Sequence, residues 1–552
     1  MKTINILLIS LLTTVLLTCC YEDEGNYDYN DLPKVSIYID YVYDIALGDV
    51  LHIEPEVTLS KEAQNYNLAY KWILEGEVIG TERVLDWVSD RFTKERNDNL
   101  IFEVTDVDND ISYREGISFS ITDKYDIDGY LVLAEKSGKK YLHLIRKSYD
   151  EEWNEIYIPL IDPVGLENDG ITIPATSFKI HEHYCEQDDD MKVQIMVLAE
   201  DQTFELEGTS MKEVPYKLTD LFNGNIPADL HNSLKDVFFM QYLDLINDTK
   251  GHLYSRMKST FEVFHSDYFL SSPVSFEGEV LEGIDIIPSC YGTNTPFCLL
   301  HDKNKKRFLA IWDYQDKFST TFVTGKIQEI ANSERKWPEG VPTGNEICEG
   351  YTIHRIEAYK REVSSYPPAT RYSCIVQSNV TGEYYIYDFG LQRDYNDVDA
   401  YWAVDDSETT VDATFEKIPD EVLPLFTNPD NVIYTLPWGQ LGWCTLIAQG
   451  KELYVYNRKA SMAGSGDLNP NPRKVSYAFE SEIGVMNANT YESRYMGVAF
   501  RDGTFQVLNI AEISQGRCEA IWKSEQNLDL GTPLSMWFHT NGNLNLDWRD
   551  SN

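Results

Sequence analysis

The strongest constraint on the fold is a repeated pattern in which two apolar runs flank a short polar turn. It occurs eight times from residue 126 onward, with turn centres near residues 138, 202, 249, 304, 381, 450, 502 and 541. The mean spacing is about 58 residues, the length of one four-stranded sheet with its loops. Gly138 and Gly503 lie in two of these turns, where a tight hairpin needs the positive φ that glycine adopts easily. Repeated sheets of this size usually close radially, so we expect a β-propeller over residues 126–552.

The number of blades stays open between two values. Eight hairpins predict eight blades, whereas seven result if the first and last hairpins share one blade and thereby close the ring. The alternative to a propeller is a row of separate sandwiches. That arrangement is less favoured, because no linker-like segment interrupts residues 130–548.

Residues 33–122 have a different pattern, with the strand-like runs VSIYIDY, LHIEPEVTL, NLAYKWILEG, NLIFEVTDV and ISFSIT separated by turn residues. Trp72 is placed like the core tryptophan of an immunoglobulin-type sandwich, although the flanking cysteines are absent. We therefore expect an all-β chain that begins with a β-sandwich. Asp106, Asp108 and Asp110 could supply calcium ligands, but the glycine and distal Glu of a calcium loop are missing. An acidic hairpin turn is the favoured interpretation.

The N-terminus combines one cation, Lys2, with an uncharged run over residues 4–18 that ends at two cysteines. The run has the length of a signal-peptide core and is shorter than the about 20 residues of a membrane-spanning helix. The residues before Cys19 and Cys20 resemble a bacterial lipobox, in which the lipid-bearing cysteine becomes the first residue after cleavage. An ordinary secretory signal with accidental cysteines is the alternative.

The segment after Cys20, YEDEGNYDY, resembles the mature N-terminus of the PKD-like lipoproteins of the Bacteroidota, which favours Cys20 over Cys19 as the lipidated residue. The resemblance implies a lipoprotein signal peptide over residues 1–19, an acidic tether over 20–32 and a PKD-like sandwich over 33–122. It also implies palmitate-type anchoring in the outer membrane, facing the cell exterior, beside a SusC/SusD-type nutrient importer.

The charge balance excludes some partners. The chain has 90 acidic and 47 basic residues and a formal net charge of −43, so its surface repels nucleic acid. Acidic residues 22–24 would also repel anionic head groups and extend the tether, whose residues 21–32 can reach at most about 40 Å. No later apolar run approaches 18 residues, so we expect membrane contact through the lipid alone.

The remaining seven cysteines are an odd number, so at least one is unpaired in the monomer. Only Cys290 and Cys298 lie close enough in sequence to suggest a local disulfide. His181, His183 and Cys185 alternate, so on a strand they would share one face and could begin a zinc or copper site. Further ligands at a matching spacing are missing, and we predict no metal and no cofactor.

Catalytic motifs are also missing, since the chain contains no HExxH, no GxSxG and no P-loop pattern. With 90 acidic residues among 552, a pair of glycosidase carboxylates cannot be recognised from the sequence. We predict that the protein is not an enzyme, with a propeller hydrolase or lyase as the alternative.

Two long inserts, over residues 314–349 and 390–431, are the first places to expect a ligand site, because loops on rigid scaffolds often carry function. Aromatic residues in or beside them could stack on sugar rings or peptide side chains. They are Trp337, Tyr395, Tyr401, Trp402 and Trp438. The alternative is that each ring packs beneath its own loop. Short helices are also expected over residues 227–237 and 326–335.

Together with the resemblance, these features predict a surface lipoprotein that binds or caps an oligopeptide or a glycan for a SusC/SusD-type importer. The alternatives are the enzyme named above and a purely structural lid or scaffold of the importer.

Overall fold

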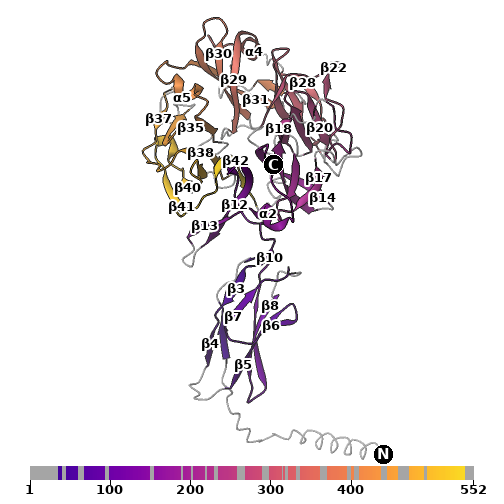
Figure 1. Cartoon of the computed structure of the whole chain (residues 1–552), viewed down its shortest axis with the longest axis vertical. Coiled ribbons are helices and arrows are strands. Elements are labelled where there is room, and N and C mark those ends of the chain that lie inside the picture. The colour runs from indigo at the N-terminus through magenta and orange to yellow at the C-terminus, as the bar shows by residue number, and fades with distance from the viewer. Residues whose placement is uncertain are drawn as a thin grey trace, which may run out of the picture. The chain divides into compact units, whose positions relative to one another are not determined.

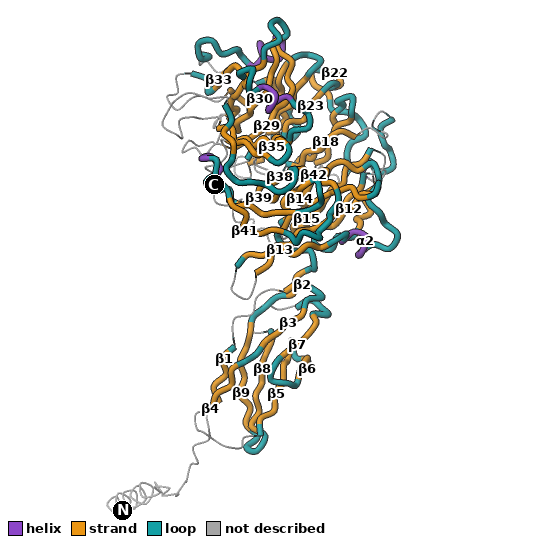
Figure 2. The backbone as a smooth tube through the Cα atoms, turned by 60° about the vertical axis from the view of Figure 1, so that its left-hand side comes forward, coloured by secondary structure: helices purple, strands orange, loops and turns teal. Residues whose placement is uncertain are grey.

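The computed structural model divides the chain into two compact units, Met1–Thr122 and Asp123–Asn552. It describes residues 35–39, 45–59, 67–93, 99–149, 154–187, 190–200, 203–217, 221–228, 230, 234–240, 242–257, 268–288, 297–313, 315–316, 321–330, 336–360, 370–393, 400–402, 410–436, 444–457, 471–489 and 494–540. Both units consist mainly of strands, as Figure 2 shows by colour, so the all-β prediction is confirmed. None of the described helices is long and apolar enough to cross a membrane.

The first unit is a sandwich of antiparallel strands with one parallel pair. Its largest sheet has the order β6 (Glu77–Gly80), β5 (Leu68–Leu74), β8 (Leu100–Asp106), β9 (Ile111–Ile117). The smaller sheets pair β1 (Val35–Tyr38) with β4 (Glu56–Leu59), β3 (Val50–Ile53) with β7 (Leu85–Val88), and β2 (Ile45–Ala46) in parallel with β10 (Ile121–Thr122). Apolar residues from all these sheets share one core.

Trp72 lies at the centre of this core, as the sequence predicts. Its side chain is fully buried, its ring centroid lies 4.4 Å from that of Phe102, and its indole nitrogen donates to the carbonyl of Glu82 at 3.0 Å. The Asp106 carboxylate accepts hydrogen bonds from the backbone amides of Asp108 and Asn109 in the turn between β8 and β9. The acidic segment therefore forms a hairpin turn.

The second unit contains seven main sheets among its described residues. The first has the order β13 (Glu155–Leu160), β12 (Lys139–Tyr149), β11 (Gly129–Lys136), β42 (Thr532–His539). The second and third are β14 (Ser177–Gln187), β15 (Asp190–Ala199), β16 (Phe204–Glu207), β17 (Glu213–Lys217), and β18 (Leu234–Phe239), β19 (Leu243–Asp248), β20 (Leu253–Met257). The fourth is β23 (Ile284–Ile287), β24 (Phe297–Asp302), β25 (Arg307–Trp312), β28 (Ile327–Glu329).

The fifth sheet contains β29 (Tyr351–Lys360), β30 (Thr370–Ser378) and β31 (Tyr384–Arg393), with β32 (Ala400–Trp402) and β33 (Ala413–Lys417) both pairing with β31. The sixth is β34 (Val432–Thr435), β35 (Cys444–Gln449), β36 (Glu452–Asn457), β37 (Arg473–Lys474). The seventh is β38 (Ile483–Ala488), β39 (Tyr495–Phe500), β40 (Phe505–Asn509), β41 (Glu519–Lys523).

Short elements fill the connections of this unit. Two small hairpins pair β21 (Ser275–Phe276) with β22 (Glu279–Val280) and β26 (Gln315–Asp316) with β27 (Thr321–Phe322). The helical elements are α2 (Pro163–Glu167), α4 (Gly344–Gly350), α5 (Leu423–Thr427) and the 3₁₀ turn η4 (Ile513–Gln515).

The seven sheets have a propeller-like arrangement. In Figure 1 they follow one another around the second unit in sequence order, from purple through magenta and orange to yellow. Contacts between neighbouring sheets join β42 to β14, β15 to β18, β18 to β23, β23 to β29, β29 to β34, β34 to β38 and β38 to β42. The C-terminal strand β42 pairs with β11, so the first sheet contains segments from both ends of the unit.

The hairpin prediction agrees with the structure at seven of the eight positions, where the two apolar runs form paired neighbouring strands. Gly138 and Gly503 have φ values of 76° and 85°. A Cβ at Gly503 would lie 2.8 Å from the backbone nitrogen of Leu530, so this turn has no room for a side chain. The eighth pattern does not form a sheet of its own in the described residues, because its first strand, β42, joins the first sheet.

The two predicted helices are wrong. Residues 234–237, expected at the end of a helix, belong to β18, and residues 327–329 form β28. Each segment pairs with a neighbouring strand, β18 with β19 and β28 with β25. Tertiary pairing therefore overrides the local helix preference of these segments.

Candidate functional site

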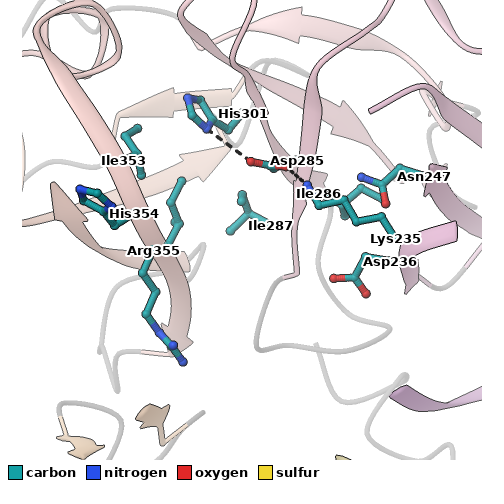
Figure 3. Close-up of a pocket in the computed structure, with 11 residues that line it drawn as sticks. Lys235, Asp236, Asn247, Asp285, Ile286, Ile287, His301, Ile353, His354 and Arg355 are labelled. Carbon is teal, nitrogen blue, oxygen red and sulfur yellow. Dashed lines mark hydrogen bonds and ion pairs between the residues drawn. The ribbon is translucent and has the colours of Figure 1, made fainter. Parts of the chain in front are cut away.

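A polar pocket with a volume of about 250 Å³ lies in the second unit, between the third, fourth and fifth sheets. Strands β18, β23 and β29 provide most of its wall, and β19 and β24 add one residue each. In Figure 3, Lys235, Asp236 and Asn247 lie on one side of the view, and His354 and Arg355 on the other. The pocket thus combines side chains that are far apart in sequence.

Irregular pairing marks two of the strands at the pocket. In β18, Leu234 pairs with Asp248 and Asp236 with Asn247, which leaves Lys235 as an extra residue. In β29 the register shifts in the same way at His354. Bulges of this kind redirect side chains and are frequent beside functional sites.

Asp285 of β23 is the centre of the first charge cluster. Its carboxylate accepts hydrogen bonds from Lys235 and, at 3.1 Å, from Lys303, and Nδ1 of His301 lies 3.9 Å from it. Burial alone would raise the pKa of Asp285, but the two lysine partners lower it. Asp285 is therefore an ionised, paired carboxylate at neutral pH.

Asp236 of β18 is the centre of the second cluster. It lies 2.8 Å from Nζ of Lys179 and 3.3 Å from Nε2 of His181. Burial opposes ionisation, but His181 and Lys179 hold the pKa of Asp236 well below its usual range. His183, two residues along β14, contacts Glu205 at 3.0 Å instead.

His181 and His183 contact different carboxylates, so these two members of the suggested metal-binding trio do not converge on one point. The side chain of Cys185 lies outside the described residues. Among the residues that are described, no group of three or more His, Cys, Asp or Glu side chains could hold a metal ion.

The opposite wall of the pocket comes from β29. Arg355 donates to Glu357 at 2.7 Å and to the carbonyl of Ile433 at 2.6 Å. His354 is exposed and contacts the amide oxygen of Gln377 at 3.1 Å. Each charged group that lines the pocket thus already has a partner of opposite charge.

Two polar groups at the pocket, Asn247 and His301, have hydrogen-bonding capacity that no described group uses. Asn247 is fully buried and its Nδ2 donates to the carbonyl of Ile284 at 3.1 Å, but its Oδ1 accepts no hydrogen bond. The ring nitrogens of His301 lie within hydrogen-bonding distance of no described group, and burial lowers the pKa of His301. At neutral pH this imidazole is uncharged and offers one donor and one acceptor.

The aromatic residues predicted from the sequence do not line this pocket. Trp402 is only 3% exposed and packs in the core of the fifth sheet, so the expectation of an exposed ring is wrong for this residue. A Cβ on Gly344 would lie 2.2 Å from the Trp402 ring, which means that α4 covers the ring closely. Trp337 is half-buried and its ring centroid lies 5.4 Å from that of Trp402. These two rings pack together beneath their own loops.

The other predicted residues give less information. Tyr401 belongs to β32, but its side chain is not described. Cys20, Tyr395 and Trp438 lie outside the described residues. Cys290, the suggested disulfide partner of Cys298, lies outside the described residues. Cys298 itself is a buried free thiol, and burial raises its pKa.

The sequence analysis missed the pocket residues. Lys235 and Asp236 fall within the segment expected to be helical, and Asp285 and His301 belong to no motif. The signal that could have identified β18 is the run Val237–Met240, which is apolar like the buried strands of the hairpins.

Comparisons with solved structures find low overall similarity. The periplasmic gluconolactonase PpgL of Pseudomonas aeruginosa aligns with a TM-score of 0.35 and 8% identity over 75% of this chain and 99% of that protein. A DUF4784 family protein from Bacteroides caccae aligns with a TM-score of 0.28 and 8% identity over 92% and 99%. The β-propeller domain of Cps50 from Myceliophteria thermophila aligns with 0.26 and 8% over 58% and 92%.

Sequence comparison finds no match among curated proteins. Residues 20–161 match the model of the PKD-like family. The matched segment covers the first unit from residue 20 onward and continues through β13, the outermost strand of the first sheet in the second unit. The N-terminal part of the chain is thus PKD-like in sequence and forms a sandwich.

Proposed function

We propose that this protein is a lipid-anchored accessory protein of the bacterial outer membrane that captures a nutrient for a SusC/SusD-type importer. The observation that carries the proposal is the polar pocket between β18, β23 and β29. It offers hydrogen-bonding groups on a scaffold of paired strands, which is what a binding site for a small polar ligand needs.

Anchoring through Cys20 is the second part of the proposal. The match to the PKD-like family begins at residue 20, the cysteine that follows the lipobox-like segment. One acyl chain holds a protein to a membrane only weakly, whereas two or more anchor it stably. A lipoprotein cysteine with several chains would therefore keep the protein beside an importer in the same membrane and raise its effective concentration there.

Capture without turnover is the third part. A general acid or base works best when its pKa lies near the working pH. The pKa values of Asp236 and Asp285 are both lowered by cationic partners, so both carboxylates are ionised at neutral pH. Neither can donate a proton there, and their charges are shared with lysines. These two carboxylates thus lack the general acid of a glycoside hydrolase, and on this ground we propose binding without turnover.

The ring of inter-sheet contacts also supports a finer proposal for the fold. We propose that residues 123–552 form a closed seven-bladed propeller in which β42 completes the blade of β11, β12 and β13. His539 of β42 lies 2.5 Å from Glu182 of β14, and Thr540 donates to the same carboxylate at 3.0 Å. These bonds fasten the last strand to the second sheet.

The test is purification from detergent-solubilised outer membranes, followed by mass spectrometry of proteins and small molecules. We expect a SusC/SusD-type pair to co-purify with the wild type, and Cys20→Ala to be lost from the membrane fraction while Cys19→Ala is retained. A mature N-terminus at Cys19 would refute the lipid assignment. Turnover of a bound nutrient by the purified protein would favour the enzyme, and co-purification of the importer without any ligand binding would favour a structural lid.

A further inference from the structure

We infer that the pocket binds an uncharged ligand rich in hydroxyl groups and about the size of one sugar residue, that is, a unit of a neutral saccharide. This inference rests on the proposed capture function and specifies its ligand. It depends on three features of the pocket, namely its paired charges, its unpartnered polar groups and its apolar wall.

The paired charges disfavour a charged ligand. Lys235 is bound to Asp285, Asp236 to Lys179, and Arg355 to Glu357. The side chains of Asp236 and Asp285 are only 23% and 28% exposed. A ligand carboxylate or ammonium would have to compete for one member of a pair and leave the other partly buried without its partner, which is costly. A neutral ligand can accept or donate hydrogen bonds while the pairs stay intact.

The unpartnered groups specify what the ligand must supply. Oδ1 of Asn247 is enclosed by protein and out of reach of a ligand, so the requirements on the ligand come from His301 and Asp285. Neutral His301 needs one acceptor and one donor, and the remaining lone pairs of Asp285 accept further hydrogens. A hydroxyl group satisfies each of these requirements, because it donates and accepts at the same atom.

The close spacing of the hydrogen-bonding groups in this small pocket favours a sugar over a peptide as the ligand. Asp285 and His301 are paired across β23 and β24 and both line the same pocket of about 250 Å³. A saccharide ring carries hydroxyls on adjacent carbons, whereas an extended peptide repeats its amide groups only every 3.3 to 3.6 Å or so and has charged ends. Ile287 and Ile353, which pack in the same apolar cluster, supply an apolar wall for the C–H face of a ring. The volume lies below the 300 Å³ or so at which drug-sized ligands fit, so one ring is accommodated.

The first experiment is titration calorimetry of the purified full-length protein with defined probes. The neutral probes are glucose, galactose, mannose, xylose and their short oligomers, the charged ones are glucuronate and glucosamine, and the peptide probes are uncharged-side-chain tripeptides. We expect at least one neutral saccharide to bind, and its charged counterpart to bind at least about tenfold more weakly. Binding of a charged sugar as tightly as its neutral counterpart, or no binding of any neutral saccharide, would overturn the inference.

The second experiment compares variants with the best neutral saccharide. His301→Phe removes both ring nitrogens and keeps the ring contact with Phe308, whose centroid lies 5.5 Å away, so we expect a folded protein with about fivefold to tenfold weaker binding. His301→Gln restores a donor and an acceptor and should recover part of the affinity. His52→Gln, at an exposed site in the first unit, is the control for loss of an imidazole. Unchanged affinity in His301→Phe contradicts the assignment.

The outcomes separate this inference from the proposed function. If tripeptides bind and saccharides do not, the inference fails while nutrient capture stands. If a neutral saccharide binds with the expected variant effects but no importer co-purifies from the membrane, the inference stands and the importer association fails.

Discussion

The two units are built from the same kind of antiparallel strand but differ in how they bury charge. In the first unit, the buried carboxylate of Glu103 binds Lys71 and Arg114, whose side chains are 51% and 63% exposed. In the second, Arg371 and Asp388 form an ion pair at 2.5 Å in which both side chains are less than 5% exposed. Arg256 and Asp244 form another such pair at 2.8 Å.

This difference in buried charge follows from how the interior of each unit is built. A two-layer sandwich can fill its interior with apolar side chains alone, as the cluster around Trp72 does. The second unit has many interfaces between sheets, and ion pairs such as Lys179 with Asp236 and Lys235 with Asp285 join strands of different sheets there. Unpaired polar groups in such an environment are costly unless a ligand or water satisfies them. This contrast agrees with the proposal that the second unit binds the ligand and that the first unit is a spacer.

The largest expected effect tests whether the second unit depends on its last strand. A chain that ends at Gly531 lacks β42, and with it the contacts of Phe538 with Tyr130 and of His539 with Glu182. It also leaves β11 with an open edge. We expect loss of the whole stability of the second unit, about 5 to 15 kcal/mol for a typical domain, while the sandwich still unfolds cooperatively.

Differential scanning calorimetry measures this prediction, because two compact units should give two transitions. A chain that ends at Thr540 keeps β42 and is the matched control. Two unchanged transitions in the chain ending at Gly531 would show that the ring of sheets does not need its C-terminal strand.

The second prediction compares one arginine from each unit. Arg371→Met leaves the buried Asp388 and the half-buried Asp412 without their cation, and removing one partner of a buried pair costs about 3 to 5 kcal/mol. Arg114→Met leaves Glu103 bound to Lys71, and the loss of an exposed partner costs about 1 kcal/mol or less. Urea unfolding of both variants measures the difference. Equal costs would refute the contrast between the units.

Much of this fold was predictable from local sequence chemistry. The hairpins of the second unit are marked by polar turns, and the core position of Trp72 follows from its place in an apolar run. The sharing of one sheet by β11 and β42 was predictable only as an alternative to eight blades. That choice depends on pairing between segments at opposite ends of the unit, which no local pattern encodes.

The site was much less predictable. Lys235, Asp285 and His301 meet because three strands from two sheets pack together, and each residue alone reads as an ordinary surface position. Trp402 was misjudged for the converse reason. It stands in a long insert between two predicted hairpins, where an exposed ring is expected, but the absence of a side chain at Gly344 lets α4 approach and bury the ring. In both cases the decisive contact is between segments distant in sequence.

The smallest predicted effect concerns a histidine in each unit. Burial lowers the pKa of His143 in β12 to about 4, although the hydrogen bond between its Nε2 and the carbonyl of Leu530, at 3.0 Å, opposes this. In the first unit, the hydrogen bond to Asp86 raises the pKa of the exposed His52. The signs are opposite, so acidification should affect the two transitions differently.

The unfolded chain binds a proton at His143 more tightly than the folded protein does. The contribution of His143 to the free energy of unfolding is therefore fully present above pH 6.5 or so and is lost as the pH falls toward 4. Between pH 7.5 and 5 this histidine should cost the second unit about 2 kcal/mol. His52 works in the other direction, since a raised pKa gives stability that is present below pH 6.5 or so and lost above it. Urea unfolding of wild type, His143→Gln and His52→Gln at the two pH values measures how much each histidine contributes to the pH dependence of the free energy of unfolding. His143→Gln should flatten the pH dependence of the second unit alone, and an unchanged slope in that variant would mean that His143 is not neutral in the folded protein.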